Sequence, residues 1–295
     1  MMKKARLIYN QKAGESKDNR EPSIEEIREA IEKHGFSVEL APTEQPGDGK
    51  RLSREATDMD TVFILGGDGT VHECINGLAE QKQEQPPSAA ILPGGTCNDF
   101  ARTLGIPLDL IEAVDALCSG STRNVDVPKI NDNHFLNFLA VGLIADTSEN
   151  IDADLKRATG RLSYFWSALQ TTLQPVQYSY EIATESEKLE GEAVLILVAN
   201  GNYIGSVTLP REHDINDGYL HMYIVKEAGL SLINAWREAR LDEEFQEGEN
   251  LIYRKVQHLT LNVNPKGNID VDGEDGGKPP VEIVTGKKLR FHFPI

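Results

Sequence analysis

Residues 62–77, with the sequence VFILGGDGTVHECING, constrain the fold more than any other stretch of the chain. The four apolar residues at its start have the length of a buried strand and are too few for a lone helix. Three glycines follow, Gly66, Gly67 and Gly69, around Asp68. Apolar residues with helical spacing come next, so the pattern predicts a strand, a glycine turn and a helix.

The glycine turn has two interpretations. Glycine adopts backbone angles closed to other residues and lets a ligand approach the main chain, so successive N–H groups of the turn could face an anion. Thr70 is placed to cap the helix, whose positive end would then face a phosphate. The same glycines also fit a plain strand-to-helix turn. Asp68 favours the phosphate, because a carboxylate beside phosphates requires a cation such as Mg²⁺ between them.

Composition narrows the classes of function. The chain has 295 residues, 39% of them hydrophobic, which is enough for two domains with separate cores. The net charge of −17 argues against nucleic acid and against electrostatic anchoring on an anionic membrane. Three cysteines without a CxxC pair predict a reduced, cytoplasmic protein. No segment approaches the roughly 18 consecutive apolar residues of a transmembrane helix.

The first 127 residues alternate strand and helix patterns. Strands are expected over residues 5–9, 36–40, 62–65 and 89–92, and helices from Pro22 to Gly35, over 52–56, after Thr70 and over 109–119. This alternation predicts a doubly wound α/β domain with a parallel sheet and a ligand site at the carboxyl ends of its strands. A second glycine turn, residues 93–96, is expected at the same sheet edge, with Asn98 or Asp99 capping a short helix behind it.

From residue 123 the pattern changes to short strands separated by turns, which predicts an antiparallel β-sandwich. The expected strands are 123–127, 135–141, 178–183, 193–199, 219–225 and 256–263, with helices over 155–173 and 228–241 as exceptions. We therefore expect an α/β nucleotide-binding domain over residues 1–127 and a β-sandwich over 128–280. Residues 281–295 are expected to return to the first domain.

Two acidic segments each have two interpretations. In residues 268–277, NIDVDGEDGG, the carboxylates of Asp270, Asp272 and Glu274 alternate. An extended backbone would place all three on one face, which is costly without a cation or a proton; as charge alone, the segment is a solvated turn. Residues 213–221, HDINDGYLH, contain either an ordinary Asp-Gly turn or an oxygen-rich loop that suits a hard cation.

The motifs GGDGT and LPGGTCNDFARTLGIP, with NFLAVGLIAD, LKRATGRLSY, ANGNYIG, NDGYL and VDGE further on, resemble the family of diacylglycerol kinases, sphingosine kinases and bacterial lipid kinases. GGDGT alone is shared with NAD kinases and 6-phosphofructokinases, but NAD kinases lack the second motif. The resemblance covers nearly the whole chain. It implies an ATP-dependent kinase with a lipid acceptor, most simply diacylglycerol, and an active site in the cleft between the two domains.

The resemblance also implies roles for single residues. Glu274 is expected to be the general base, with Asp272 as its close neighbour, and Asp68 is expected to hold the catalytic Mg²⁺. The positions that match ATP-binding residues of the family are Asn10, Gln11, Lys12, Ala13, Gly14, Thr43, Gly66, Gly67, Asp68, Gly69, Thr70, Val71, His72 and Thr96. A structural Mg²⁺ is implied at Asp214, Asp217 and Tyr219, and the charged positions implied near the active cleft are Asp99, Arg102, Asp126 and Lys156.

Some features keep alternatives open. Glu73 matches a family glutamate, but a glutamate in the first turn also stabilises a helix. A basic set, Lys156, Arg157 and Arg161, suits either a membrane interface or a solvated helix face. Three departures from the family pattern are the absence of proline after Asn10, the pair Gly205-Ser206 in place of a richer glycine run, and His72 in place of asparagine.

The resemblance is compatible with a homodimer and implies peripheral contact with a membrane that carries the lipid. Two rival functions are a soluble kinase of the NAD kinase type and a catalytically silent nucleotide-binding regulator. Retention of both Asp68 and Glu274 speaks against the silent regulator, because ATP binding alone needs no base.

Overall fold

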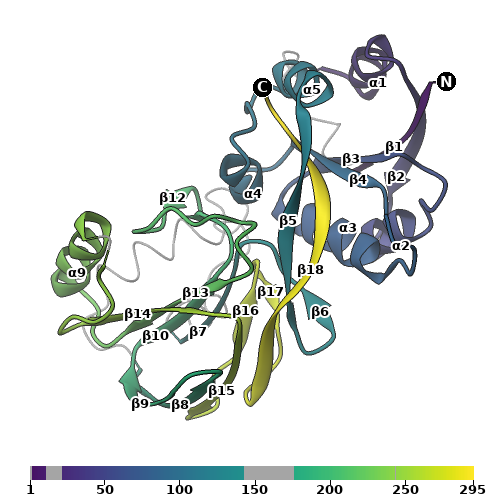
Figure 1. The fold of residues 1–295 in the computed structure, drawn as a ribbon. Coiled ribbons are helices and arrows are strands. Elements are labelled where there is room, and N and C mark those ends of the chain that lie inside the picture. The colour runs from purple at the N-terminus through teal and green to yellow at the C-terminus, as the bar shows by residue number, and fades with distance from the viewer. Residues whose placement is uncertain (1, 11–21, 143–175, 243) are drawn as a thin grey trace. The chain divides into compact units, whose positions relative to one another are not determined.

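The computed structural model describes residues 2–10, 22–142, 176–242 and 244–295. The chain divides into two compact units (Figure 1). The first unit consists of Met1–Val127 together with Lys287–Ile295, and the second consists of Pro128–Gly286. Two strands, β5 (Ser121–Ile130) and β18 (Val281–Phe293), begin in one unit and end in the other.

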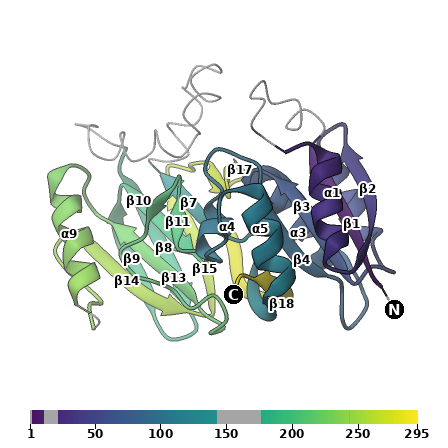
Figure 2. The same ribbon diagram turned by 90° about the horizontal axis from the view of Figure 1, so that it is seen from above.

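The first unit is a parallel sheet with helices on both faces. Its strands are β1 (Lys3–Asn10), β2 (Phe36–Thr43), β3 (Thr61–Gly66) and β4 (Ser88–Pro93), in the order β2-β1-β3-β4, with the end of β18 beside β4. The helices are α1 (Ile24–Lys33), α2 (Asp48–Arg54), α3 (Asp68–Glu80), α4 (Asp99–Thr103) and α5 (Leu110–Ser119). Helices α1 and α5 lie on one face and α2 and α3 on the other (Figures 1 and 2). The predicted doubly wound fold is confirmed.

Capping residues set the helix boundaries. Helix α1 begins after Ser23, whose hydroxyl and the Glu26 carboxylate form a capping box, and not at Pro22 as predicted. Asp109 caps α5 by accepting two backbone N–H groups. The prediction that Thr70 caps α3 is wrong, because this helix begins at Asp68 with Gly67 as its N-cap and Thr70 lies in its first turn.

The second unit is built from antiparallel strands. The six-stranded sheet has the order β14-β13-β10-β7-β16-β17, and β18, β15, β8 and β9 follow one another in the other sheet. The strands are β6 (Asn133–His134), β7 (Phe138–Gly142), β8 (Tyr178–Thr184), β9 (Lys188–Ala193), β10 (Leu195–Ala199), β11 (Tyr203–Ile204), β12 (Val207–Thr208), β13 (Leu220–Val225), β14 (Leu251–Val256), β15 (His258–Asn264), β16 (Ile269–Val271) and β17 (Glu274–Asp275), with one described helix, α9 (Leu230–Leu241). This confirms the predicted β-sandwich.

Two of the predicted strands cross from one sheet to the other. The pattern over 193–199 divides at Val194: Ala193 is the last residue of β9, and β10 begins at Leu195 in the other sheet. The pattern over 256–263 divides in the same way at Gln257, between β14 and β15. At each crossing only one residue separates the two strands. The sequence pattern therefore shows no gap at which the change of sheet could be recognised.

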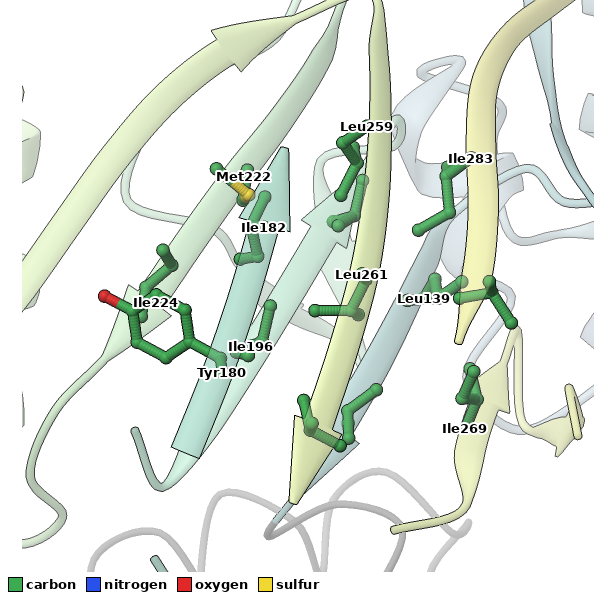
Figure 3. Close-up of a cluster of buried hydrophobic side chains, with 14 of the residues drawn as sticks. Leu139, Tyr180, Ile182, Ile196, Met222, Ile224, Leu259, Leu261, Ile269 and Ile283 are labelled. Carbon is green, nitrogen blue, oxygen red and sulfur yellow. The ribbon is translucent and has the colours of Figure 1, made fainter. Parts of the chain in front are cut away.

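The central strands of the six-stranded sheet, β7, β10 and β13, are buried on both faces. The inner face of this sheet contributes Leu139, Ile196, Met222 and Ile224 to a cluster that also contains Leu261 and Ile283 from the other sheet (Figure 3). The alternate residues of the same strands form a second cluster with Ala239 of α9. Burial on both faces explains why β10 reads as a continuous apolar run.

Some predicted features lie outside the described residues: the helix over 155–173 with Lys156, and the residues Gln11, Lys12, Ala13 and Gly14. Of the helices that the structure describes, none has both the length and the apolar character needed to cross a bilayer.

Candidate active site

Two glycine turns lie against each other at the carboxyl ends of β3 and β4. The N–H of Gly94 donates to the carbonyl oxygen of Gly66 at 3.0 Å, and a Cβ on Gly95 would lie 2.4 Å from the Cα of Gly67. A Cβ on Gly66 would lie 2.6 Å from that of Thr70. None of these glycines has a positive φ. The prediction of unusual backbone angles is therefore wrong, and glycine is needed here because the two backbones approach so closely.

Asp68 connects the two turns. Its Oδ1 accepts the backbone N–H of Asp99 at 2.8 Å, and Asp99 itself is only 1% exposed. Asn98 occupies the N-cap position of α4, but its side chain does not cap the helix. Its amide bonds both the N–H and the carbonyl oxygen of Gly95, at 2.8 and 2.7 Å, and so closes the second turn. The Asp68 carboxylate is thereby held, half-buried, at the edge shared by both turns.

The first turn of α3 has no side-chain cap among the described residues, so its N–H groups face the carboxyl edge of the sheet. The residues of the predicted cradle, 66–72, differ in how accessible they are. Val71 is buried, and its N–H donates to the carbonyl oxygen of Gly67 at 3.1 Å within the helix. The carbonyl oxygen of His72 accepts the side-chain amide of Asn76 at 3.0 Å. Gly66 and Val71 are buried, whereas residues 67–70 and His72 are half-buried and lie near the exposed Thr96.

Thr43 is the last residue of β2 and lies opposite Asn10, the last residue of β1. The predicted strand over residues 36–40 ended before Thr43, but strand β2 continues through it. Its hydroxyl donates to the carbonyl oxygen of Tyr9 at 3.3 Å. Both residues therefore lie at the same carboxyl edge as the glycine turns.

The acidic segment near the end of the chain is a hairpin, so the predicted alternation of three carboxylates on one face is wrong. Val271 pairs with Glu274, and the two-residue loop between them has φ of 53° at Asp272 and 90° at Gly273, as in a type I′ turn. Asp272 is 5% exposed, and its carboxylate accepts the backbone N–H groups of residues 136, 137 and 138 at 2.8 to 3.0 Å. Glu274 is exposed to solvent.

The loop between residues 214 and 219 is held by an ion pair. Asp217 accepts the N–H of Tyr219 at 2.9 Å through Oδ1, and Lys255 Nζ lies 2.7 Å from Oδ2. The hydrogen bond to Asp217 raises the pKa of Lys255. Asp214 accepts the N–H of Asn216 at 3.0 Å. Within the described ranges, no group of three or more His, Cys, Asp or Glu residues could hold a metal. A cation at Asp217 would therefore compete with Lys255.

The other predicted charged residues have separate partners. Arg102 Nε donates to the carbonyl oxygen of Cys97 at 2.9 Å, which attaches Arg102 to the second glycine turn. Asp126 is buried and forms an ion pair of 3.2 Å with Lys288 of β18, inside the first unit. The structure thus brings Asp99 and Arg102 to the glycine turns and gives Asp126 a partner on another strand.

Family comparisons agree with this arrangement. Residues 4–130 match the family described as "Diacylglycerol kinase catalytic domain". Residues 138–290 match the family described as "YegS C-terminal NAD kinase beta sandwich-like domain". The matches cover an α/β unit with packed glycine turns and an antiparallel sandwich, which together define a protein of the kinase class.

Relatives extend the match over the full fold. The "Putative lipid kinase" of Staphylococcus carnosus is 33% identical over 285 residues, covering 94% of this chain and 92% of the relative. That of Staphylococcus aureus strain Newman is 33% identical over 289 residues, with the same coverage. The crystal structure of a "putative diacylglycerol kinase" from Bacillus anthracis superposes with a TM-score of 0.82 at 30% identity, covering 99% of this chain and 95% of that one. The chain belongs to the diacylglycerol kinase-like family of lipid kinases.

Proposed function

We propose that the protein transfers the γ-phosphoryl group of ATP to the hydroxyl of a lipid, and that diacylglycerol is this lipid. The packed glycine turns with Asp68 at their junction are the observation that supports the proposal most directly. A main chain without side chains, an uncapped helix start and a single acidic side chain form a surface that suits the phosphates of a nucleotide. Family membership supports a lipid as the acceptor.

The first unit would bind the donor. Residues 66–70, Thr96, Thr43 and Asn10 lie at one sheet edge, and we propose that they contact ATP together with residues 11–14. Mg²⁺ is usually bound by one or two carboxylates, substrate phosphates and water, so a single half-buried carboxylate such as Asp68 fits a nucleotide-bound Mg²⁺. Bound there, Mg²⁺ would offset the negative charge of the phosphates. The hydrogen bond from Asp99 fixes the direction of the Asp68 carboxylate.

The second unit would supply the base. A lipid hydroxyl is a weak acid, so a carboxylate within hydrogen-bonding reach must take its proton while the oxygen bonds to the γ-phosphorus. We propose that the carboxylate of Glu274 accepts this proton. The bond between the γ-phosphorus and the β–γ bridging oxygen breaks in the same reaction, and ADP leaves. Asp272, occupied by three backbone N–H groups, would hold the hairpin in place rather than accept the proton.

The lipid acceptor implies that the protein works at a membrane surface. We propose peripheral association from the cytoplasmic side, as the reduced cysteines and the lipid kinase relatives suggest. A homodimer is compatible with this proposal and is open to direct measurement by light scattering.

Radiolabelled ATP, offered with a panel of lipids in mixed micelles, tests the proposal. The panel would contain diacylglycerol, monoacylglycerol, ceramide and sphingosine, with NAD as a soluble acceptor because the second matched family is described as NAD kinase-like. We expect label in phosphatidic acid. Label in NADP alone would overturn the lipid assignment, and nucleotide binding without any labelled product would indicate a silent regulator.

A further inference from the structure

Glu73 links helix α3 to the loop that follows strand β2. It lies on the same helix as Asp68, five residues further on. Its Oε1 accepts the N–H of Gly47 at 2.9 Å, and its Oε2 accepts the N–H of Gly49 at 3.0 Å. One carboxylate therefore holds two backbone groups at the start of helix α2, on a segment 24 to 26 residues earlier in the chain.

The start of α2 is shaped to receive this carboxylate. Gly47 is the N-cap, with a φ of 89°, and as a glycine it has no side chain that could cap the helix. Gly49 lies directly under Glu73, because a Cβ added there would be 2.9 Å from Oε2 and 3.0 Å from the Glu73 Cβ. Glu73 thus takes the role that an N-cap side chain has in other helices.

A second carboxylate fixes the other side of the same loop. Asp48 Oδ2 accepts the N–H groups of Glu44 and Gln45 at 3.0 and 3.1 Å. These two residues directly follow Thr43, so the loop leaves the end of β2 in a defined direction. The hydrogen bond from Glu44, together with the neighbouring Arg51 and Gln45, lowers the pKa of Asp48. Asp48 shapes the loop, and Glu73 attaches it to α3.

We propose that Glu73 is a positioning residue for nucleotide binding: it holds the loop after Thr43 at a fixed place relative to Asp68. The inference rests on the proposed function in that the ends of β2 and α3 contact the same nucleotide. Glu73 itself is occupied by backbone groups and does not touch ATP.

The same pair of helices offers a matched control. Glu80, at the other end of α3, forms ion pairs with Lys50 at 2.6 Å and with Arg54 at 3.4 Å, both on α2. Glu80→Gln therefore weakens the packing of α2 on α3 without touching the loop. A general packing effect should appear in both variants, and a positioning effect only in Glu73→Gln.

The experiment compares wild type, Glu73→Gln and Glu80→Gln by titration with a fluorescent ATP analogue and by steady-state kinetics. Glutamine retains one acceptor oxygen and loses the charge, so Glu73→Gln should weaken nucleotide binding and raise the KM for ATP roughly 10-fold. The kcat and the KM for lipid should stay within about 2-fold, as should every parameter of Glu80→Gln.

Gly49→Ala keeps the inference testable if Glu73→Gln unfolds. Its methyl group would push the carboxylate away and should reproduce the loss of nucleotide affinity. The double variant should bind no more weakly than the single ones, because both break the same contact. Wild-type affinity in Glu73→Gln, or equal losses in Glu73→Gln and Glu80→Gln, would overturn the inference. If the wild-type protein binds nucleotide but phosphorylates no lipid, only the proposed acceptor is overturned.

Discussion

The three carboxylates that have roles in the proposed function have different surroundings. Asp68 is half-buried and accepts one backbone N–H from the neighbouring turn. Asp272 is buried and accepts three. Glu274 is exposed, two residues from Asp272. Three N–H groups occupy the oxygens of Asp272, whereas Glu274 is exposed, so Glu274 is better placed to meet a hydroxyl group and be the base.

Glu274→Gln should lower kcat by about 100-fold to 10,000-fold, because the amide has the same shape but cannot take the hydroxyl proton. Nucleotide affinity should stay within a few-fold of wild type. Asp275→Asn, on the same hairpin, is the control: Asp275 accepts the nearby N–H of Gly277 and is exposed, so activity should be unchanged. Near-wild-type turnover in Glu274→Gln would show that Glu274 is not the general base.

Asp68→Asn should reduce activity sharply while the fold stays intact. The asparagine oxygen can still accept the Asp99 N–H, so the junction of the turns survives and only the negative charge is lost. Circular dichroism should match wild type, and Mn²⁺ should restore part of the activity because it binds most oxygen sites more tightly than Mg²⁺. Kinetics with each metal measure this. Full turnover at low Mg²⁺ would show that Asp68 only shapes the turn.

Elements of the fold were largely predictable where the pattern is local. The strands and helices of the first unit follow apolar periodicity, and the carboxyl edge follows from their alternation. The Asp272-Gly273 hairpin was predicted as an extended segment, although Asp-Gly is a strong signal for a type I′ turn. The contact of Glu73 with Gly47 and Gly49 could not be predicted, since it joins two elements distant in sequence. The two interpretations that the sequence offered for Glu73, a match to a family glutamate and a stabilising charge in the first helical turn, do not involve this contact.

At the scale of single elements, Asp217 in the loop between residues 214 and 219 could bind either a metal ion or the side chain of Lys255. We expect Mg²⁺ to raise the melting temperature of wild type slightly, because Lys255 competes for the same carboxylate. Lys255→Gln should enlarge this rise, and Asp217→Ala should remove it and lower the melting temperature. Calorimetry with Mg²⁺ or a chelator measures each case. If the melting temperature responds to Mg²⁺ in the same way in all three proteins, the loop is an ordinary turn and not a Mg²⁺ site.

At the scale of the whole molecule, two buried histidines make stability depend on pH. The rings of His213 and His221 stack with centroids 3.7 Å apart, and each bonds a tyrosine hydroxyl at 2.8 Å. Burial holds the pKa of His213 well below its usual range and lowers the pKa of His221 to about 3. Unfolded histidine binds a proton near pH 6.5, so the unfolded state binds more protons below that pH, and stability falls as the pH falls.

Each of these histidines should therefore reduce the free energy of unfolding by about 1.4 kcal/mol per pH unit below roughly pH 6.5. The effect of His221 should continue down to its folded pKa of about 3. His221→Phe keeps a stacking ring and removes one titrating group, so the slope should be shallower. Urea unfolding at pH 7, 6 and 5 measures the slopes. A slope independent of His221 would contradict this account.

The end of strand β18 has a consequence for biosynthesis. Phe291 pairs with Ala89, is completely buried and packs on Phe100 with ring centroids 5.5 Å apart, while His292 lies within 3.2 Å of the hydroxyls of Thr61 and Ser88. A ribosome that has released Met1–Val127 has therefore not yet delivered the strand beside β4. Until all of Pro128–Gly286 has been translated, the edge of β4 that later pairs with β18 is exposed and can pair with a wrong strand. A stop codon that removes only the last nine residues would thus damage the amino-terminal unit first.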